Sequence, residues 1–271
     1  MSISASESRL FQTLRDGAGG RHCVVCFSGG LDSTVVLAAC MRLGLPTTAL
    51  LATGPSLARE ERAEARALAA QLGAELVEAD TGETEDPAYR ANSGDRCYHC
   101  KKNLFEKALE LAAERWPGAL ILCGNQADDL GDDRPGMRAG QERGVASPLL
   151  EAGLGKDAIR ELARAWELPI ADKPATPCLA SRFPVGSEVT PERLAQVEAV
   201  ESFLRAHGLW PGRARWHGPV VRLEIARELM PRALEEPLRT DLERACWRAG
   251  FRFAALDLGG IQSGSLSRAL G

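Results

Sequence analysis

The stretch Val24-Val25-Cys26-Phe27-Ser28-Gly29-Gly30-Leu31-Asp32-Ser33-Thr34 decides the fold. Its four apolar residues, 24–27, predict a buried strand, and the apolar run 35–41 behind it predicts a helix. The two glycines between them permit a tight turn and a close approach of the backbone to a ligand. Backbone N–H groups and the positive end of the helix dipole then meet at one place, which suits a phosphate group. Ser28 and Ser33 can add hydroxyl donors.

This stretch does not contain the GxxxxGK[ST] pattern of a Walker A loop. It resembles instead the SGG-x-D-S signature of the PP-loop ATP pyrophosphatases, which adenylate a substrate and release pyrophosphate. The resemblance implies ATP binding by Ser28, Gly29, Gly30, Asp32, Ser33 and Thr34. Beside an anion, Asp32 is explained by Mg²⁺ binding or by capping of the helix. A glycine turn without a ligand is the alternative interpretation.

Length and composition exclude several classes of protein. The 271 residues suffice for one large domain, or for an ordinary domain followed by a small one. The net charge of −4 and the lack of a long basic block disfavour a nucleic-acid partner such as tRNA. No apolar run approaches the length of a membrane span, and residues 1–7 do not resemble a secretion signal. We therefore expect a cytoplasmic protein without a membrane partner.

Strand and helix patterns alternate along the first two thirds of the chain. The predicted strands are 24–27, 47–51, 74–79 and 119–124, with 145–149 continuing the sheet or its rim. The predicted helices are 7–16, 35–43, 57–72, 96–115, 137–143 and 154–166. This alternation predicts an α/β fold with a doubly wound parallel sheet. Ligands of such sheets bind beyond the carboxyl ends of the strands, where the phosphate loop lies.

The pattern changes at Pro184, where we place a domain boundary. Thr190 and Pro191 are typical of the first positions of a helix. They precede a predicted helix at 192–206, strands at 213–217, 220–225 and 251–256, and a largely helical segment at 231–249 that is interrupted near Pro237. The predicted domains are therefore 1–183, the PP-loop domain, and 184–271, a small α+β domain for substrate binding or oligomerisation.

The eight cysteines fall into two groups. A chain of this length does not need a disulfide scaffold, so free, catalytic or metal-bound thiols are expected. Cys23 and Cys26 lie three apart on a strand and point to opposite faces, which excludes a shared metal. Together with Cys40, Cys123 and Cys246, which lie in apolar surroundings, they are predicted to be core residues.

Cys97, Cys100 and Cys178 lie in polar segments instead. The first two begin a predicted helix beside basic residues, a setting typical of reactive or metal-bound thiols. The third lies in a loop framed by prolines, where functional residues are common. Three thiolates and one open iron suit a [4Fe–4S] cluster. A zinc site with His99 as fourth ligand, or a surface redox pair at 97 and 100, remains an alternative.

Taken together, these motifs resemble the LarE family of ATP-dependent sulfur transferases. The resemblance rests on the segments 27–33, 95–101, 125–136, 172–182 and 256–265. It implies sulfur insertion during synthesis of the nickel-pincer nucleotide cofactor of lactate racemase. ATP with Mg²⁺ would adenylate a carboxylate of pyridinium-3,5-biscarboxylic acid mononucleotide, and sulfur would then displace AMP. Two rounds would give the dithio product.

The resemblance implies one of two sulfur sources. In one branch of the family, a lone cysteine at the position of Cys178 gives up its sulfur and becomes dehydroalanine. In the other branch, three cysteines hold a [4Fe–4S] cluster, and the three cysteines here favour this branch. Sulfide or a sulfur-donor protein would then be a partner. The resemblance also suggests a homo-oligomer such as a hexamer.

Other polar residues are candidates for binding phosphate or substrate. Asp128 is a candidate for Mg²⁺ or pyrophosphate, with a turn-forming role as the alternative. Arg213 and Arg215 alternate along a predicted strand and share a face, which suits a substrate with a phosphate and two carboxylates. The alternative is a solvated strand face. The remaining candidates for this substrate site are Ser181, Arg182 and Glu201.

Two competing functions remain open from the sequence. A PP-loop tRNA thiolase can also carry three cysteines and a cluster, although the mild acidity of the chain argues against it. A non-catalytic nucleotide-binding or metal-binding protein would not need Asp32, Asp128 and the cysteine set together.

Overall fold

A computed structural model of the chain describes residues 3–131, 135–174 and 176–262. It has two compact units: unit 1 comprises Met1–Tyr89 and Asp95–Thr176, and unit 2 comprises Arg90–Gly94 and Pro177–Gly271. The domain boundary predicted from the sequence lies at residue 184, which would place Cys178 in the first domain. The compact units of the structure divide between Thr176 and Pro177, so Cys178 belongs to unit 2. Residues 132–134 and 263–265 of the family motifs lie outside the described residues. Among the helices described, none combines the length and the apolar character needed to cross a membrane.

Unit 1 contains a four-stranded sheet in the order β3-β2-β1-β4. Every neighbouring pair in it is parallel. The strands are β1 Cys23–Cys26, β2 Thr47–Ala52, β3 Glu75–Ala79 and β4 Leu120–Leu122. The α/β fold with a parallel sheet is therefore confirmed. The predicted continuation at 145–149 is a single bridge from Ala146 to β4, followed by the short helix α7 Pro148–Glu151.

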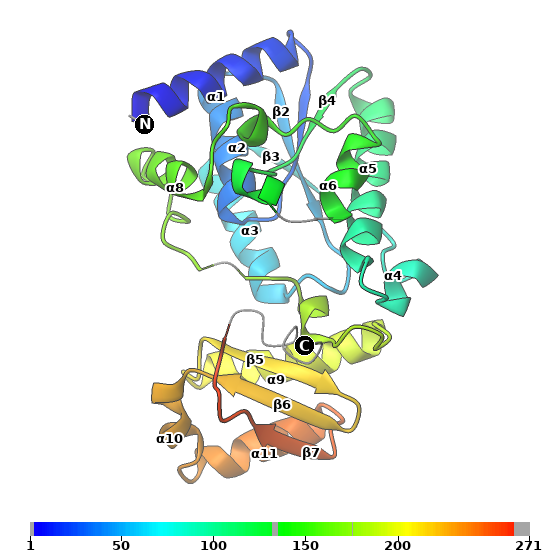
Figure 1. Ribbon diagram of the computed structural model, residues 1–271, viewed down its shortest axis with the longest axis vertical. Helices are drawn as coiled ribbons and strands as arrows, with labels where there is room; N and C mark the ends of the chain where they lie inside the picture. The colour runs from blue at the N-terminus through cyan, green and yellow to red at the C-terminus, as the bar shows by residue number, and fades with distance from the viewer. Residues whose placement is uncertain (1–2, 132–134, 175, 263–271) are drawn as a thin grey trace. The chain divides into compact units, whose positions relative to one another are not determined.

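Helices cover both faces of this sheet, which explains the unbroken apolar run in β1. Cys23 and Val25 pack with the helices of one face, whereas Val24 and Cys26 pack with those of the other. The first face is covered by α1 Ile3–Ala18, α2 Leu31–Arg42, α3 Arg59–Gln71 and α8 Lys156–Ala165. The second face is covered by α5 Arg96–Arg115 and α6 Pro135–Gln141 (Figure 1). The doubly wound arrangement is thus confirmed.

Unit 2 contains a three-stranded mixed sheet in the order β5-β6-β7. Its strands are β5 Gly212–His217, β6 Val220–Ile225, antiparallel to β5, and β7 Phe253–Leu256, parallel to β6. Helix α9 Pro191–Ala206 packs on β5, and α11 Leu238–Arg248 packs on α9 and β7. As predicted, Thr190 caps α9 by accepting a hydrogen bond from the Arg193 N–H.

Short elements complete the described chain. In unit 1 they include the 3₁₀ helix η1 Ala127–Gly131. In unit 2 they are η2 Leu179–Arg182, η3 Arg227–Leu229 and α10 Met230–Ala233. The helix α4 Pro87–Ala91 lies where the chain passes from unit 1 to unit 2. The predicted interruption near Pro237 is confirmed, because α11 starts at the following residue.

The segment that follows β4 passes close to the start of α2, and this approach depends on Gly124. A Cβ atom on Gly124 would lie 2.8 Å from the Ser33 backbone nitrogen and 3.1 Å from the Asp32 carbonyl carbon. Both neighbours are backbone atoms at the start of α2, so the helix would have to shift. The close approach fixes the end of β4 beside the phosphate loop.

We expect Gly124→Ala to lower the free energy of unfolding by about 1–3 kcal/mol, the usual cost of overpacking. Urea unfolding followed by circular dichroism measures this change. Gly17→Ala is a matched control, because Gly17 lies inside α1 and its Cβ would meet only a side chain at 3.7 Å. That variant should be neutral or more stable by about 0.5–1 kcal/mol. A Gly124→Ala variant as stable as the parent would contradict the close approach.

Candidate functional site

The predicted phosphate loop lies between the end of β1 and the start of α2. Gly29 has φ +71°, and a Cβ there would lie 2.9 Å from the Ala65 side chain, so this turn requires glycine. Gly30 occupies the N-cap position of α2 and brings no side chain to cap the helix. Ser28 donates its N–H to the Ser33 hydroxyl oxygen at 3.2 Å. The loop therefore has the shape that a phosphate group needs at a helix N-terminus.

Two side-chain hydroxyls of α2 donate hydrogen bonds to the backbone of this loop. Thr34 Oγ1 donates to the Gly30 carbonyl at 2.8 Å, and Ser33 Oγ donates to the same oxygen at 3.2 Å. Both side chains are buried, whereas Ser28 and Gly30 are exposed. The predicted ATP-binding residues 28–34 thus form one continuous turn, in which Ser33 and Thr34 hold the backbone while Ser28 and Gly30 are exposed to solvent.

Asp32 forms an ion pair that the sequence did not predict. Both of its carboxylate oxygens accept hydrogen bonds from Lys156 Nζ, at 2.8 and 2.9 Å. Lys156 is the first residue of α8, and its backbone N–H donates to Asp128 at 2.7 Å. Gly155 leaves room for this contact, because a Cβ there would lie 2.7 Å from Asp128 Oδ1.

The Asp128 carboxylate therefore closes the N-terminus of α8. This contact spans 28 residues and is not the local turn considered as the alternative for Asp128; through Lys156 it also connects with Asp32. The roles of both aspartates toward Mg²⁺ stay predictions. Lys156 was not predicted from the sequence, because its position is that of an ordinary helix start. The glycine before it, Gly155, was a weak signal that another group packs closely there.

All eight cysteines lie in the described part of the chain, and all are thiols rather than disulfides. Their burial divides them into the two groups that the sequence predicted. Five of them are buried, and burial raises the pKa of the Cys26 thiol to about 12 and that of Cys246 to about 11. Cys97 and Cys178 are exposed, and Cys100 is partly buried. The thiols that solvent reaches are therefore the same three that the sequence singled out.

Cys97 and Cys100 lie in the first turns of α5, three residues apart and hence neighbours on the helix surface. The Cys100 thiol contacts Glu83 Oε2 at 3.5 Å. His99 lies between two other carboxylates, with Nε2 at 3.2 Å from Asp95 and Nδ1 at 3.9 Å from Asp86. Only Nε2 lies within hydrogen-bond distance of a carboxylate, and metal-bound histidines commonly bind a carboxylate through one nitrogen, so the zinc alternative with His99 stays a prediction.

Cys178 belongs to unit 2, where it precedes η2. Within the parts of the chain that the structure describes, no three or more His, Cys, Asp or Glu side chains are grouped to hold a metal ion. The chemistry of the three accessible thiols still fits iron, which prefers thiolate ligands. The cluster on Cys97, Cys100 and Cys178 stays a prediction.

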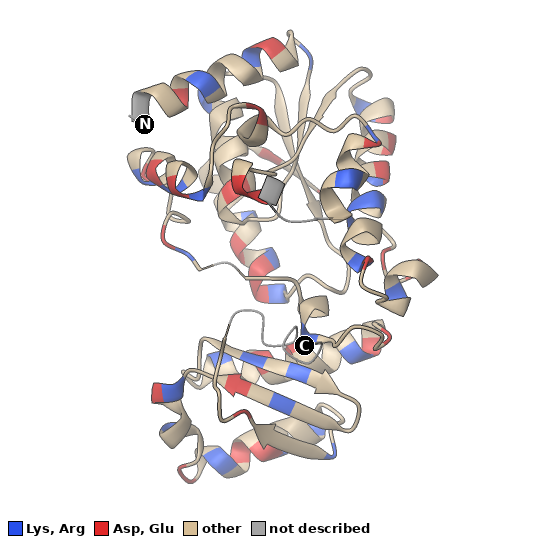
Figure 2. Ribbon diagram, in the orientation of Figure 1, with Lys and Arg blue, Asp and Glu red and all other residues tan. Residues whose placement is uncertain are grey.

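The substrate candidates of unit 2 lie on and beside the sheet β5-β6-β7, where Figure 2 shows basic residues on β5 and residues of both signs on β6. Arg215 is 3% exposed and donates to Glu224 at 2.8 Å and to the Ser181 carbonyl at 2.8 Å. Glu224 also pairs with Arg222 at 3.1 Å, and Arg222 pairs in turn with Asp257. Sequence reasoning missed these last three residues, although alternation along the neighbouring strand was a signal for Arg222 and Glu224.

A second buried ion pair joins η2 to α9. Arg182 is 1% exposed and binds Glu201 through two hydrogen bonds, at 2.8 and 2.9 Å. It also donates to the Ser181 hydroxyl at 2.7 Å, and Glu201 accepts a bond from the Ala214 N–H at 3.0 Å. The structure thus brings Ser181, Arg182, Glu201 and Arg215 together, with Arg182 and Glu201 holding the group in place.

Arg213 carries a charge that is not balanced locally. It is half-buried, and no described residue forms a hydrogen bond or ion pair with its guanidinium. Burial, and then repulsion from Arg182 and Arg215, lowers the pKa of Arg213. An anion bound here would relieve that repulsion. Arg213 and Arg215 share a face of β5 as predicted, so this face is suited to a phosphate or a carboxylate.

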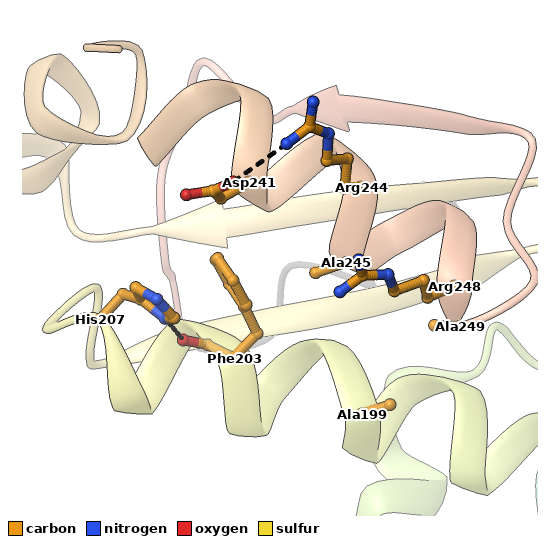
Figure 3. A pocket seen from close by; sticks show the side chains of 8 residues that line it. All are labelled: Ala199, Phe203, His207, Asp241, Arg244, Ala245, Arg248 and Ala249. Carbon is orange, nitrogen blue, oxygen red and sulfur yellow. Dashed lines mark hydrogen bonds and ion pairs between the residues drawn. The ribbon is translucent and has the colours of Figure 1, made fainter. Parts of the chain in front are cut away.

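A hollow of about 360 Å³ lies elsewhere in unit 2, between α9 and α11 (Figure 3). Phe203 and His207 stack in it at 3.9 Å, and Arg248 reaches it from α11. All predicted site residues are described by the structure, and none of them lines this hollow. The charge pattern, rather than the hollow, therefore marks the candidate site of unit 2.

Comparison with known proteins identifies the family. No family model matches the chain. The chain is 33% identical over 270 residues to the pyridinium-3,5-bisthiocarboxylic acid mononucleotide synthase of Lactiplantibacillus plantarum, a match that covers 99% of this chain and 96% of that protein. The chain belongs to the LarE family.

Two uncharacterised relatives extend this LarE comparison. A protein of Synechocystis is 38% identical over 248 residues, which cover 91% of this chain and 92% of the relative. A protein of Methanocaldococcus jannaschii is 36% identical over 138 residues, or 51% of this chain and 54% of that one. The resemblance stated from the sequence motifs is thereby confirmed at the level of the family.

We expect Glu201→Ala to lower the free energy of unfolding by about 3–5 kcal/mol, because it leaves the Arg182 guanidinium buried and unpaired. Urea unfolding measures the loss. Glu235→Ala, which removes an exposed carboxylate of unit 2, should stay within about 0.5 kcal/mol of the parent. Equal stability of the two variants would show that the buried pair does not hold η2 on α9.

Proposed function

We propose that this chain is an ATP-dependent sulfur transferase acting on pyridinium-3,5-biscarboxylic acid mononucleotide, whose carboxylates it converts to thiocarboxylates. The observation that carries the proposal is the near full-length match to the synthase of Lactiplantibacillus plantarum. The phosphate loop of unit 1 and the arginine-bearing strand of unit 2 support it, because the reaction needs a nucleotide and a polyanionic substrate.

The first half of the reaction is activation of a carboxylate. A carboxylate oxygen attacks the α-phosphorus of ATP, the bond to the β-phosphate oxygen breaks, and pyrophosphate leaves. The Ser28–Gly30 turn is suited to the phosphates, and Asp32 is the residue that would hold Mg²⁺. Lys156, which pairs with Asp32 beside the same loop, would stabilise the departing charge.

The second half of the reaction is attack by sulfur on the acyl adenylate, with AMP as the leaving group. Arg213 and Arg215 would hold the phosphate or a carboxylate of the substrate. A [4Fe–4S] cluster held by Cys97, Cys100 and Cys178 would supply the transferred sulfur, fed by sulfide or a donor protein. Sacrificial loss of the Cys178 sulfur is the alternative, and it leaves dehydroalanine behind.

The decisive assay combines the protein, prepared without oxygen, with ATP, Mg²⁺, sulfide and the biscarboxylate nucleotide. We expect pyrophosphate and AMP to form only when the nucleotide is present, and mass spectrometry to find one and then two sulfur atoms in the product. Incorporation of sulfur into tRNA instead would favour the thiolase alternative. Absence of any nucleotide-dependent pyrophosphate would contradict the proposal.

In the same assay, Lys156→Ala should slow pyrophosphate release by about a hundredfold, because a cation facing developing negative charge is lost. Lys107→Ala is a matched control, since Lys107 pairs with Glu110 on the outer surface of α5. Its rate should equal that of the parent. A Lys156→Ala variant at full rate would remove this lysine from the reaction.

The sulfur source is tested by anaerobic purification with iron and sulfide analysis. We expect a broad visible absorption in the parent and its loss in Cys97→Ala, Cys100→Ala and Cys178→Ala alike, because each removes one of three thiolate ligands. Cys246→Ala, which removes a buried thiol of unit 2, should keep the iron content. A colourless parent in which Cys178 becomes dehydroalanine after turnover would contradict the cluster.

A further inference from the structure

A buried carboxylate faces the second thiol of the Cys97–Cys100 pair. Glu83 lies in the loop after β3 and is 3% exposed. Its Oε2 atom accepts a hydrogen bond from Cys100 Sγ at 3.5 Å, while Cys97 stays exposed. Carboxylates are rarely buried in this way unless their oxygens have partners, so the arrangement needs an explanation.

The other oxygen of Glu83 is fixed by the loop after β2. Oε1 accepts hydrogen bonds from both the N–H group of Ser56, at 3.3 Å, and its hydroxyl. Gly54 makes room for the carboxylate, because a Cβ at that position would lie 2.8 Å from Oε1. One oxygen therefore anchors the side chain and the other is aimed at the sulfur.

The loop that carries Glu83 is also attached to α5 one turn farther on. Asp86 accepts hydrogen bonds from Asn103 at 3.3 Å and from Lys102 at 3.5 Å. It accepts a third from the Ala88 N–H at 2.9 Å. Asp86 therefore anchors this loop on α5 without help from Glu83. What Glu83 adds is the contact with the Cys100 thiol.

We propose that Glu83 is a positioning residue for Cys100: it fixes the direction of this sulfur and makes the two thiols of the pair inequivalent. Cys97 then stays exposed, whereas the Cys100 thiol is held by Glu83, which is itself anchored on Ser56. A cysteine binds a metal as its thiolate, so iron binding would remove the proton that Cys100 donates to Glu83 and would place two negative charges side by side. The extension to iron binding rests on the proposed function; the inequivalence of the thiols does not.

The inequivalence is tested on the metal-free protein by timed alkylation with iodoacetamide and mass spectrometry of both cysteines. Cys97 is the internal reference. In the parent, Cys100 should react more slowly than Cys97. In Glu83→Ala and Glu83→Gln, the ratio of the Cys100 rate to the Cys97 rate should rise about fivefold, the effect of one hydrogen bond.

Two comparisons separate positioning from a loosened loop. Glu83→Gln keeps the size of the side chain and an oxygen for Ser56, so its unfolding midpoint should match that of the parent while the rate ratio still rises. Glu85→Ala, an exposed glutamate of the same loop, should leave both the ratio and the midpoint unchanged. A ratio that stays at the parent value in Glu83→Gln would overturn the proposal, even if Glu83→Ala raises it by loosening the loop.

Iron uptake gives the second readout. After anaerobic reconstitution with iron and sulfide, both Glu83 variants should bind iron about fivefold more tightly than the parent and Glu85→Ala, because binding no longer breaks a hydrogen bond from Cys100 to a carboxylate. A parent that binds no iron would sink the cluster part of the proposed function, and the alkylation ratio would still decide the positioning role. Unchanged iron affinity in both Glu83 variants would overturn the extension to metal binding.

Discussion

The close approach of the Gly29 backbone to Ala65 is the constraint on which unit 1 depends. It lets the chain turn from a strand buried on both faces into a helix whose first N–H groups stay open. Because the strand is covered on both sides, the turn cannot shift without disturbing two cores at once. The geometry of the loop that is predicted to bind phosphate is therefore maintained by packing.

The parts of the fold that the sequence predicted are those set by local patterns. The β1–α2 junction follows from apolar runs and glycines, and the cap at Thr190 follows from a helix-start signal. The ion pair of Asp32 with Lys156 joins residues that are 124 positions apart in the sequence, and a local sequence pattern cannot predict such a contact. The compact units divide between Thr176 and Pro177, whereas the domain boundary predicted from the sequence lies at Pro184, where the local pattern changes.

The two units use charge differently. In unit 1, the charge of Asp32 beside the predicted phosphate loop is matched by the Lys156 ammonium, and the backbone N–H of Lys156 binds the Asp128 carboxylate. In unit 2, the arginines that are fully buried are matched by Glu201 and Glu224, whereas Arg213 has no direct ion pair and lies near Arg182 and Arg215 as well as near these two glutamates. Alternation along β5 predicted that Arg213 and Arg215 share a face, but it could not say which would be neutralised, because the matching carboxylates come from other elements.

The burial of five cysteines has a consequence for chemical selectivity. Reagents such as polysulfides exchange with any thiolate that they reach. Burial keeps such reagents away from five of the thiols, and it also raises the pKa of Cys26 and Cys246. Among the eight cysteines, the thiols that such a reagent reaches from solvent are therefore those at 97, 100 and 178, the three that the sequence predicts to be functional.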